Sequence, residues 1–171
     1  KNICYTNSTR KYVNKLLNDV ISKDFSSILI PVNKIKVGED KYIDDTYSQK
    51  IKIHKGVPLI SRMNDKHKYK IVNNEEFICK KIKTINKMKI AILESIRPND
   101  KGEPTKYNIN IPLFKIQEHF ALGYCITTHK SQGSTIEGNL TIWDWEKMDK
   151  KLRYTALTRA TKNKNIHFRN I

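Results

Sequence analysis

The first 50 residues combine a strand, a helix and a less regular stretch. Residues 2–6 are predicted as a short strand. A helix follows, because its apolar residues recur at steps of three and four, and Ser8 or Thr9 can cap its start. Those apolar residues are Tyr12, Val13, Leu16, Leu17, Val20 and Ile21. Residues 24–50 contain Pro, Gly and an acidic cluster, so we expect a surface excursion there.

Short strands separated by turns dominate the middle of the chain. Residues 51–61 alternate and then run apolar, which predicts a strand, a turn and a second strand. Asn73–Asn74 marks a tight turn, because Asn tolerates positive φ. Three further strands are predicted, at residues 77–82, 88–95 and 107–111. Several short strands in so short a stretch indicate a small β-barrel.

The last third has the pattern of an α/β fold. Residues 121–128 form an apolar run that predicts one strand, followed by a turn at Ser131, Gln132 and Gly133. Further strands are predicted at 140–143 and 166–168, with a helix over 146–160 between them. Strands that alternate with helices imply a mostly parallel sheet with helices on it, so the predicted fold class is α/β.

The charge of the chain indicates a polyanionic partner. There are 33 Lys and Arg residues against 17 Asp and Glu, which gives a net charge of +16, and the isoelectric point is near 9.7. Such a balance is typical of nucleic-acid-binding proteins. The alternative is a generally Lys-rich protein from an AT-rich genome, which the many Lys, Asn and Ile residues also fit.

The cysteines and histidines give no sign of a disulfide framework or a metal site. Cys4, Cys79 and Cys125 are far apart and odd in number, so we expect buried thiols in a reducing, intracellular compartment, the cytoplasm or nucleus. The five histidines lack zinc-ligand spacing. No apolar run of about 18 residues is present, so no membrane partner is expected. The chain begins with Lys and without a signal-peptide pattern, so we expect a piece of a longer protein.

The segment ITTHKSQGS places polar side chains at the end of a predicted strand. Open α/β sheets bind ligands at strand ends, and hydroxyl, imidazole and backbone N–H groups suit phosphate oxygens. Lys130 adds charge, and Gly133 allows the backbone to turn and approach a ligand closely. The structural alternative is a polar strand-to-helix turn in which Ser caps the helix.

The segment YTALTRAT places Arg159 among small residues, so we expect its guanidinium to have few obstructing neighbours. An arginine offered at an interface can stabilise the charge that develops on a transferred phosphoryl group. The alternative is an ordinary surface salt bridge, which is the commoner state of a single arginine.

HKSQGST followed by YTALTRAT resembles the fifth and sixth motifs of superfamily 1 helicases, most closely the RecD and Pif type, which includes helicase subunits of large DNA viruses. CYTNSTRKYVN resembles the fourth motif of that group, and IHKGVPLISRMN is similar to its Gly-x-Pro strand. The resemblance implies a RecA-like fold, a mostly parallel sheet with helices, for residues 1–60 and 112–171. It also implies an inserted Src-homology-type β-barrel at 61–111.

The resemblance implies a role for each matching residue. Arg159 and Arg10 would be catalytic and would reach ATP, with Gln132 and Gly133 also at the nucleotide. The expected single-stranded DNA contacts are Thr127, Thr128, His129, Lys130 and Ser131, and the expected supporting residues are Asn7, Tyr154 and Thr158. ATP with Mg²⁺ would be held mainly by an upstream RecA-like domain of the same protein, which could also carry a primase.

The chain lacks the phosphate-binding loop pattern G-x-x-x-x-G-K-[ST], and no Asp-Glu pair follows an apolar strand. We therefore expect this segment alone to be inactive, as the C-terminal half of an ATP-dependent DNA helicase. The alternative is a non-catalytic nucleic-acid-binding module of a replication protein. A nuclease or polymerase accessory domain would need clustered carboxylates, and the only candidates lie in a predicted loop.

Overall fold

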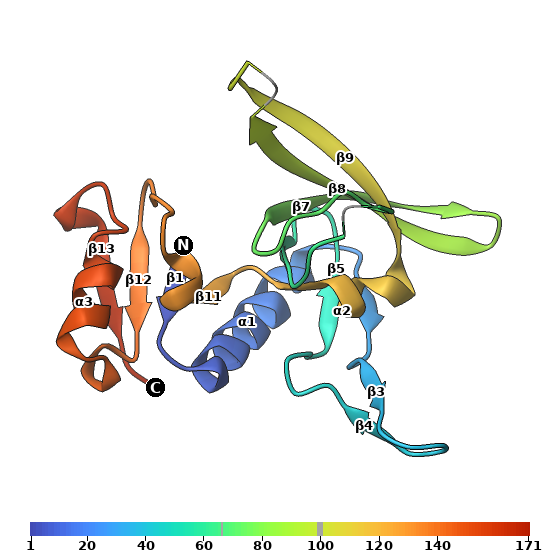
Figure 1. Cartoon of the computed structure of the whole chain (residues 1–171), viewed down its shortest axis with the longest axis horizontal. Coiled ribbons are helices and arrows are strands. Elements are labelled where there is room, and N and C mark those ends of the chain that lie inside the picture. The colour runs from blue at the N-terminus through green and yellow to red at the C-terminus, as the bar shows by residue number, and fades with distance from the viewer. Residues whose placement is uncertain (66, 99–100) are drawn as a thin grey trace. The chain divides into compact units, whose positions relative to one another are not determined.

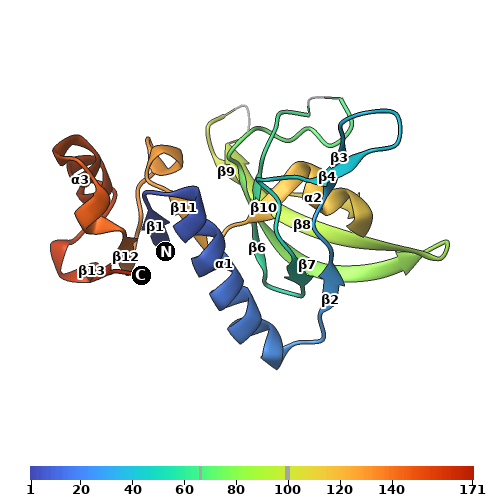
Figure 2. The same cartoon turned by 90° about the horizontal axis from the view of Figure 1, so that it is seen from below.

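The computed structural model describes residues 1–65, 67–98 and 101–171 and divides into two compact units (Figures 1 and 2). Unit 1 consists of Lys1–Leu17 and Tyr124–Ile171, and unit 2 consists of Asn18–Gly123. Helix α1 (Asn7–Ile21) crosses the boundary between them in the sequence. Among the described residues, no helix has the length and apolarity needed to span a membrane.

Unit 1 is built on a four-stranded parallel sheet. In the order β11-β1-β12-β13, its strands are Cys125–Thr127, Asn2–Cys4, Leu140–Trp143 and Ile166–Arg169. Ile3 pairs with Ile126 on one side and Ile142 on the other, and all three side chains are buried. Strands that are covered on both faces require such apolar residues. The predicted parallel sheet is therefore confirmed.

Helix α1 is fixed to this sheet by one buried amide. Asn14 donates from Nδ2 to the carbonyl oxygen of Cys125 and accepts from the N–H of Cys125, both at 2.9 Å. The predicted cap was wrong by two or three residues, because the hydroxyl of Thr6 accepts the N–H of Thr9 at 3.1 Å. A side-chain oxygen in that position satisfies a donor that the first helical turn leaves unpaired.

The predicted strand over residues 121–128 is two strands in two sheets. β10 (Phe120–Leu122) belongs to unit 2 and β11 to unit 1. The break falls after Gly123, whose N–H donates to the carbonyl oxygen of Pro58 at 2.9 Å. A Cβ at Gly123 would meet the Pro58 carbonyl carbon at 3.3 Å, a tight contact, so the close approach of the two segments favours glycine. An unbroken apolar run cannot distinguish one buried strand from two.

The helix predicted over residues 146–160 is shorter in the structure. Trp145–Lys147 forms a 3-10 turn, and α3 spans Lys150–Leu157. Asp149 begins α3, because its Oδ1 accepts the N–H of Leu152 at 2.7 Å. Aspartate at this position satisfies the first helical donors and favours a helix start there.

Unit 2 contains a five-stranded antiparallel sheet in the order β10-β6-β7-β8-β9. The bounds not yet given are β6 Pro58–Ser61, β7 Glu76–Ile85, β8 Met88–Pro98 and β9 Pro104–Pro112. The rings of Phe77 and Phe120 meet edge to face at 5.3 Å in its core, where both are buried. Two strand pairs accompany it, β2 (Ile28–Ile30) with β5 (Ile51–Ile53) and β3 (Lys34–Lys36) with β4 (Tyr42–Asp44). Helix α2 (Ile116–His119) precedes β10.

The middle of the chain differs from the expected barrel at 61–111. In the described residues the sheet is open, with β10 and β9 at its ends. β5, β10 and most of β6 also lie outside the expected range but inside unit 2. The reason is that β6 pairs with both β7 and β10, so it is held by the sheet of unit 2. The predicted turn at Asn74 is present, with φ of +66°.

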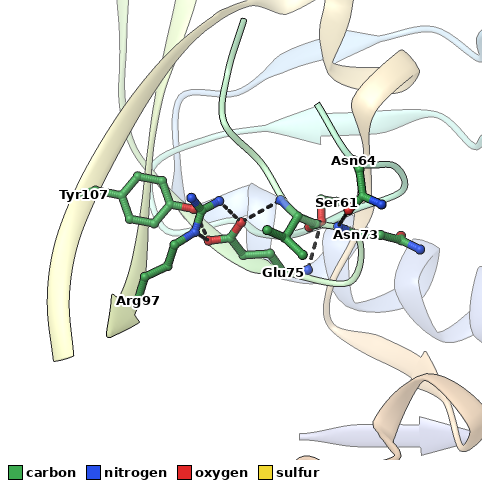
Figure 3. Close-up of polar contacts among 7 residues, drawn as sticks. Ser61, Asn64, Asn73, Glu75, Arg97 and Tyr107 are labelled. Atoms are coloured by element: carbon green, nitrogen blue, oxygen red, sulfur yellow. Dashed lines mark hydrogen bonds and ion pairs between the residues drawn. The ribbon is translucent and has the colours of Figure 1, made fainter. Parts of the chain in front are cut away.

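A carboxylate network joins three segments of unit 2 (Figure 3). Glu75 accepts from Nε of Arg97 at 2.7 Å, from a second Arg97 nitrogen and from the hydroxyl of Tyr107. The guanidinium of Arg97 also lies 4.2 Å from the Tyr107 ring centre. Burial favours a raised pKa for Glu75, but the hydrogen bonds from Arg97 and Tyr107 outweigh it and lower that pKa.

All three cysteines are buried and reduced, as predicted. Burial raises the pKa of the Cys79 thiol to about 11, which keeps it protonated. Within the part of the chain that the structure describes, no group of three His, Cys, Asp or Glu residues could hold a metal ion.

Candidate functional site

The candidate site begins at the carboxyl edge of the parallel sheet in unit 1, where ligands of open α/β sheets bind. The loops after β1 and β11 are joined there, because Thr128 donates to the carbonyl oxygen of Cys4 from its N–H at 2.7 Å and from its hydroxyl at 3.1 Å. The loop after β12 joins them through Asp144, which accepts from the N–H and the hydroxyl of Thr6.

The hydroxyl groups of Thr127, Thr128 and Ser131 are directed inward, to their own loop and, for Thr128, to Cys4. Thr128 and Ser131 are fully buried and Thr127 is 8% exposed. Ser131 donates to the carbonyl oxygen of Thr128 at 2.8 Å, and Thr127 accepts the N–H of Lys130 at 3.4 Å. These three side chains therefore shape the loop. Their burial argues against the direct DNA contact that was expected of them.

The exposed part of this loop is cationic and polar. His129 and Lys130 are exposed in the 3-10 turn His129–Ser131, and Gln132 and Gly133 are exposed immediately after it. Gly133 has φ of +81°, and a Cβ placed on it would have no neighbour within 4 Å. Glycine is therefore favoured here by the positive φ and not by lack of space. Of the predicted contact residues, His129 and Lys130 are the ones whose side chains a ligand can reach.

Arg159 is held by oxygen atoms of unit 1, contrary to the expectation that its guanidinium has few neighbours. Its Nε donates to the carbonyl oxygen of Thr155, Nη1 to that of Ser134 and Nη2 to the hydroxyl of Thr158, each at 3.1 Å. A parallel bridge between Ile136 and Ala160 fixes the same two segments. The structure thus brings the arginine of YTALTRAT next to the turn that follows HKSQG.

The two expected supporting residues near the end of α3, Tyr154 and Thr158, differ in their contacts with Arg159. Thr158 accepts from Arg159 Nη2 at 3.1 Å and donates to the carbonyl oxygen of Thr155 at 3.0 Å, so it contacts the guanidinium directly. Tyr154 is 71% exposed, and no hydrogen bond of the described residues joins it to Arg159. The expected support from Tyr154 is therefore not seen.

Arg10 lies inside unit 1, in the first turn of α1. Its side chain is 6% exposed, and Nε donates to Oδ1 of the exposed Asn7 at 3.2 Å. A hydrogen bond with Cys4 and burial raise the pKa of Cys125, and the charge of Arg10 opposes that increase. Asn7 thus contacts Arg10 at the start of the helix, whereas the burial of Arg10 does not favour an exposed nucleotide contact.

Asp144 is a site residue that the sequence analysis missed. It is 3% exposed, has φ of +61°, and accepts from Lys147 Nζ at 3.2 Å as well as from Thr6. Burial favours a raised pKa, but hydrogen bonds from Thr9 and Lys147 outweigh it and lower the pKa of Asp144. The signal was an acidic residue that directly follows the apolar strand LTIW.

The two tryptophans of the following segment are packed. Trp143 donates from Nε1 to Oδ1 of Asn2 at 3.1 Å and packs against the buried side chains of Cys4, Val13 and Cys125. The ring of Trp145 lies 4.8 Å from that of Phe168 and 5.2 Å from the guanidinium of Arg153.

No model of a known protein family matches the sequence, and no curated protein matches it significantly. Solved structures of Pif1 helicases share its fold. The Pif1 helicase from Candida albicans is 12% identical with a TM-score of 0.65, over 100% of this chain and 44% of that one. The Bacteroides Pif1 bound to ssDNA is 18% identical with a TM-score of 0.59, over 98% of this chain and 39% of that one. The chain thus has a fold found in Pif1 helicases and spans less than half the length of these two proteins.

Proposed function

We propose that the chain is the C-terminal motor half of an ATP-dependent DNA helicase. The observation that carries the proposal is the hydrogen bond from Arg159 to the carbonyl oxygen of Ser134, which joins the arginine of YTALTRAT to the turn after HKSQG. The fold shared with Pif1 helicases supports it, and so does the net charge of +16.

In this proposal Arg159 is the arginine finger for ATP and Mg²⁺ held by another RecA-like domain of the same protein. The guanidinium already points its donors at three oxygen atoms, two of them backbone carbonyls. A γ-phosphate oxygen would compete well for these donors, because it carries negative charge that attracts the guanidinium and the present carbonyl and hydroxyl oxygens do not. Gln132 and Gly133 are exposed at the turn beside Ser134, where they would sense the nucleotide.

The exposed tip of the ITTHKSQGS loop would contact single-stranded DNA. His129 and Lys130 would face the phosphates, while Thr127, Thr128 and Ser131 hold the loop in shape. The structural relative from Bacteroides was solved with ssDNA bound, which supports this choice of ligand. Contacts to the backbone make binding insensitive to base sequence and sensitive to salt.

The test is Arg159→Ala in a protein that joins this chain to its ATP-binding domain. ATP binding should persist while hydrolysis falls by about 10³-fold or more, the range known for arginine fingers. Arg159→Lys should also fail, because lysine cannot reproduce the planar fork of donors. Lys151→Ala removes the same charge from the exposed side of α3 and serves as the control. Hydrolysis near the wild-type rate in Arg159→Ala would overturn the assignment.

A further inference from the structure

Unit 2 carries a basic groove that the proposed function does not use. Strand β2 and the hairpin of β7 and β8 border it, and Figure 2 shows these elements beside one another. Its volume is about 380 Å³. The lining residues are Ser26, Ile28, Lys55, Lys81, Ile82, Thr84 and Lys89. All of them belong to unit 2.

Two features of the backbone, a glycine turn and a β-bulge, help to bring Lys55, Lys81 and Lys89 to the groove. Gly56, with φ of +89°, donates its N–H to the carbonyl oxygen of Cys79 at 2.7 Å and so fixes the turn that carries Lys55 beside β7. Immediately after Cys79 the register of β7 shifts by a β-bulge, which turns Lys81 toward the groove. Lys89 comes from β8, opposite Thr84.

The charge in this groove is not compensated. None of the described lining residues is acidic, and no ion pair of the described chain includes Lys55, Lys81 or Lys89. Two other lysines of the same sheet do form ion pairs: Lys80 and Lys106 both pair with Glu94, at 3.3 Å and 3.7 Å. Three lysines gathered without a counter-charge repel one another and form a site for an anion.

An apolar surface continues the groove. The adjoining cavity, of about 390 Å³, shares Ile28 and Lys89 with it. Phe114 and Leu29 line this cavity and are 66% and 58% exposed. A positively charged groove next to an exposed aromatic ring is the combination with which proteins bind single-stranded nucleic acid, since phosphates meet the lysines and a base stacks on the ring.

We propose that this groove is a second binding site for single-stranded nucleic acid. Lys55, Lys81 and Lys89 bind consecutive backbone phosphates and Phe114 stacks on a base. The proposal extends the proposed function, which places one contact with the strand on the loop of unit 1. The apolar continuation favours a single strand over a duplex, because paired bases do not offer their faces for stacking.

The first test measures binding of a fluorescently labelled oligothymidylate to the 171-residue chain by anisotropy at several salt concentrations. Lys55→Gln, Lys81→Gln and Lys89→Gln combined should weaken binding at least tenfold. The slope of log K against log salt should fall by about 2, from three phosphates at about 0.7 each. The control is Lys80→Gln, Lys106→Gln and Lys115→Gln combined, which removes the same charge from ion-paired lysines of unit 2. Equal losses in both triple variants would overturn the proposal.

The second test separates the ligand and the two sites. Phe114→Ala should weaken binding of the oligothymidylate about fivefold or more and leave binding of a duplex unchanged. Equal loss of binding for the oligothymidylate and the duplex would overturn the single-strand assignment. So would competition by polyglutamate that displaces the oligothymidylate from the wild-type chain and not from the groove variant, because the groove would then bind an acidic polypeptide. If His129→Ala with Lys130→Ala weakens binding and the groove variant does not, the groove proposal fails while the proposed function stands. The reverse result leaves the groove and removes the unit 1 contact.

Discussion

The carboxylate of Asp144, at the end of β12, accepts both the backbone N–H and the hydroxyl of Thr6, which follows β1. Thr6 in turn begins α1 by accepting the N–H of Thr9. One buried carboxylate therefore links the end of β12 to the residue that precedes α1. Arg10, one helical turn further on, donates to Asn7, which follows Thr6.

Asp144→Asn should destabilise unit 1 by about 2 kcal/mol. The buried carboxylate accepts several hydrogen bonds, whereas the amide that replaces it would direct its NH₂ group toward some of the same donors. Thermal unfolding of the 171-residue chain measures the loss. Glu137→Gln, which changes the same charge at an exposed position, should leave the midpoint within about a degree of wild type. A loss of similar size in both variants would mean that the network contributes little.

In the loop after β11, the buried side chains hold the loop in shape and the exposed side chains are proposed to contact DNA. Two variants should distinguish these roles. Thr128→Val removes the hydrogen bond from the buried hydroxyl to Cys4 and keeps the one from the backbone N–H, so it should cost about 1 kcal/mol of stability without changing the salt dependence of DNA binding. His129→Ala with Lys130→Ala should leave stability nearly unchanged and reduce that salt dependence. Unfolding scans and anisotropy titrations of both variants provide the comparison. If Thr128→Val alone lowered the salt dependence, its hydroxyl would contact DNA after all.

The Glu75 network should make unit 2 sensitive to acid. Because the pKa of Glu75 is lower in the folded chain than its ordinary 4.5, the ionised carboxylate stabilises the fold above that pH, and the contribution is lost as the pH falls through the folded pKa. Glu75→Gln should thus lower the unfolding midpoint at pH 7, and the difference from wild type should shrink in acid. Glu39→Gln, at an exposed position, is the control. A difference that stays constant from pH 7 to acid would exclude the ionised carboxylate as the cause.

Several elements could be predicted from the sequence because their signals are local. The strand over residues 140–143 alternates strictly in burial, and the apolar spacing of α1 follows one helical face. The turn at Asn74 has the positive φ that asparagine tolerates. The parallel sheet followed from the order of these elements.

The remaining features depend on contacts between distant parts of the chain. Nothing local shows that Gly123 packs against Pro58 and divides an apolar run into strands of two sheets. The hydroxyl of Thr128 is buried because Cys4, far away in the sequence, offers a carbonyl oxygen. Likewise, Lys81 reaches the groove through a bulge whose position is set by pairing with β8.

The insertion of unit 2 between Leu17 and Tyr124 affects the order in which the chain can fold during synthesis. β1 emerges from the ribosome well before both of its partners, β11 and β12, which follow more than 100 residues later. Bringing such distant strands together is slow, because the intervening loop must close before any contact is gained. Unit 2, whose strands pair mostly with sequence neighbours, is synthesised in full before β11. We therefore expect unit 2 to fold while β1 is still unpaired.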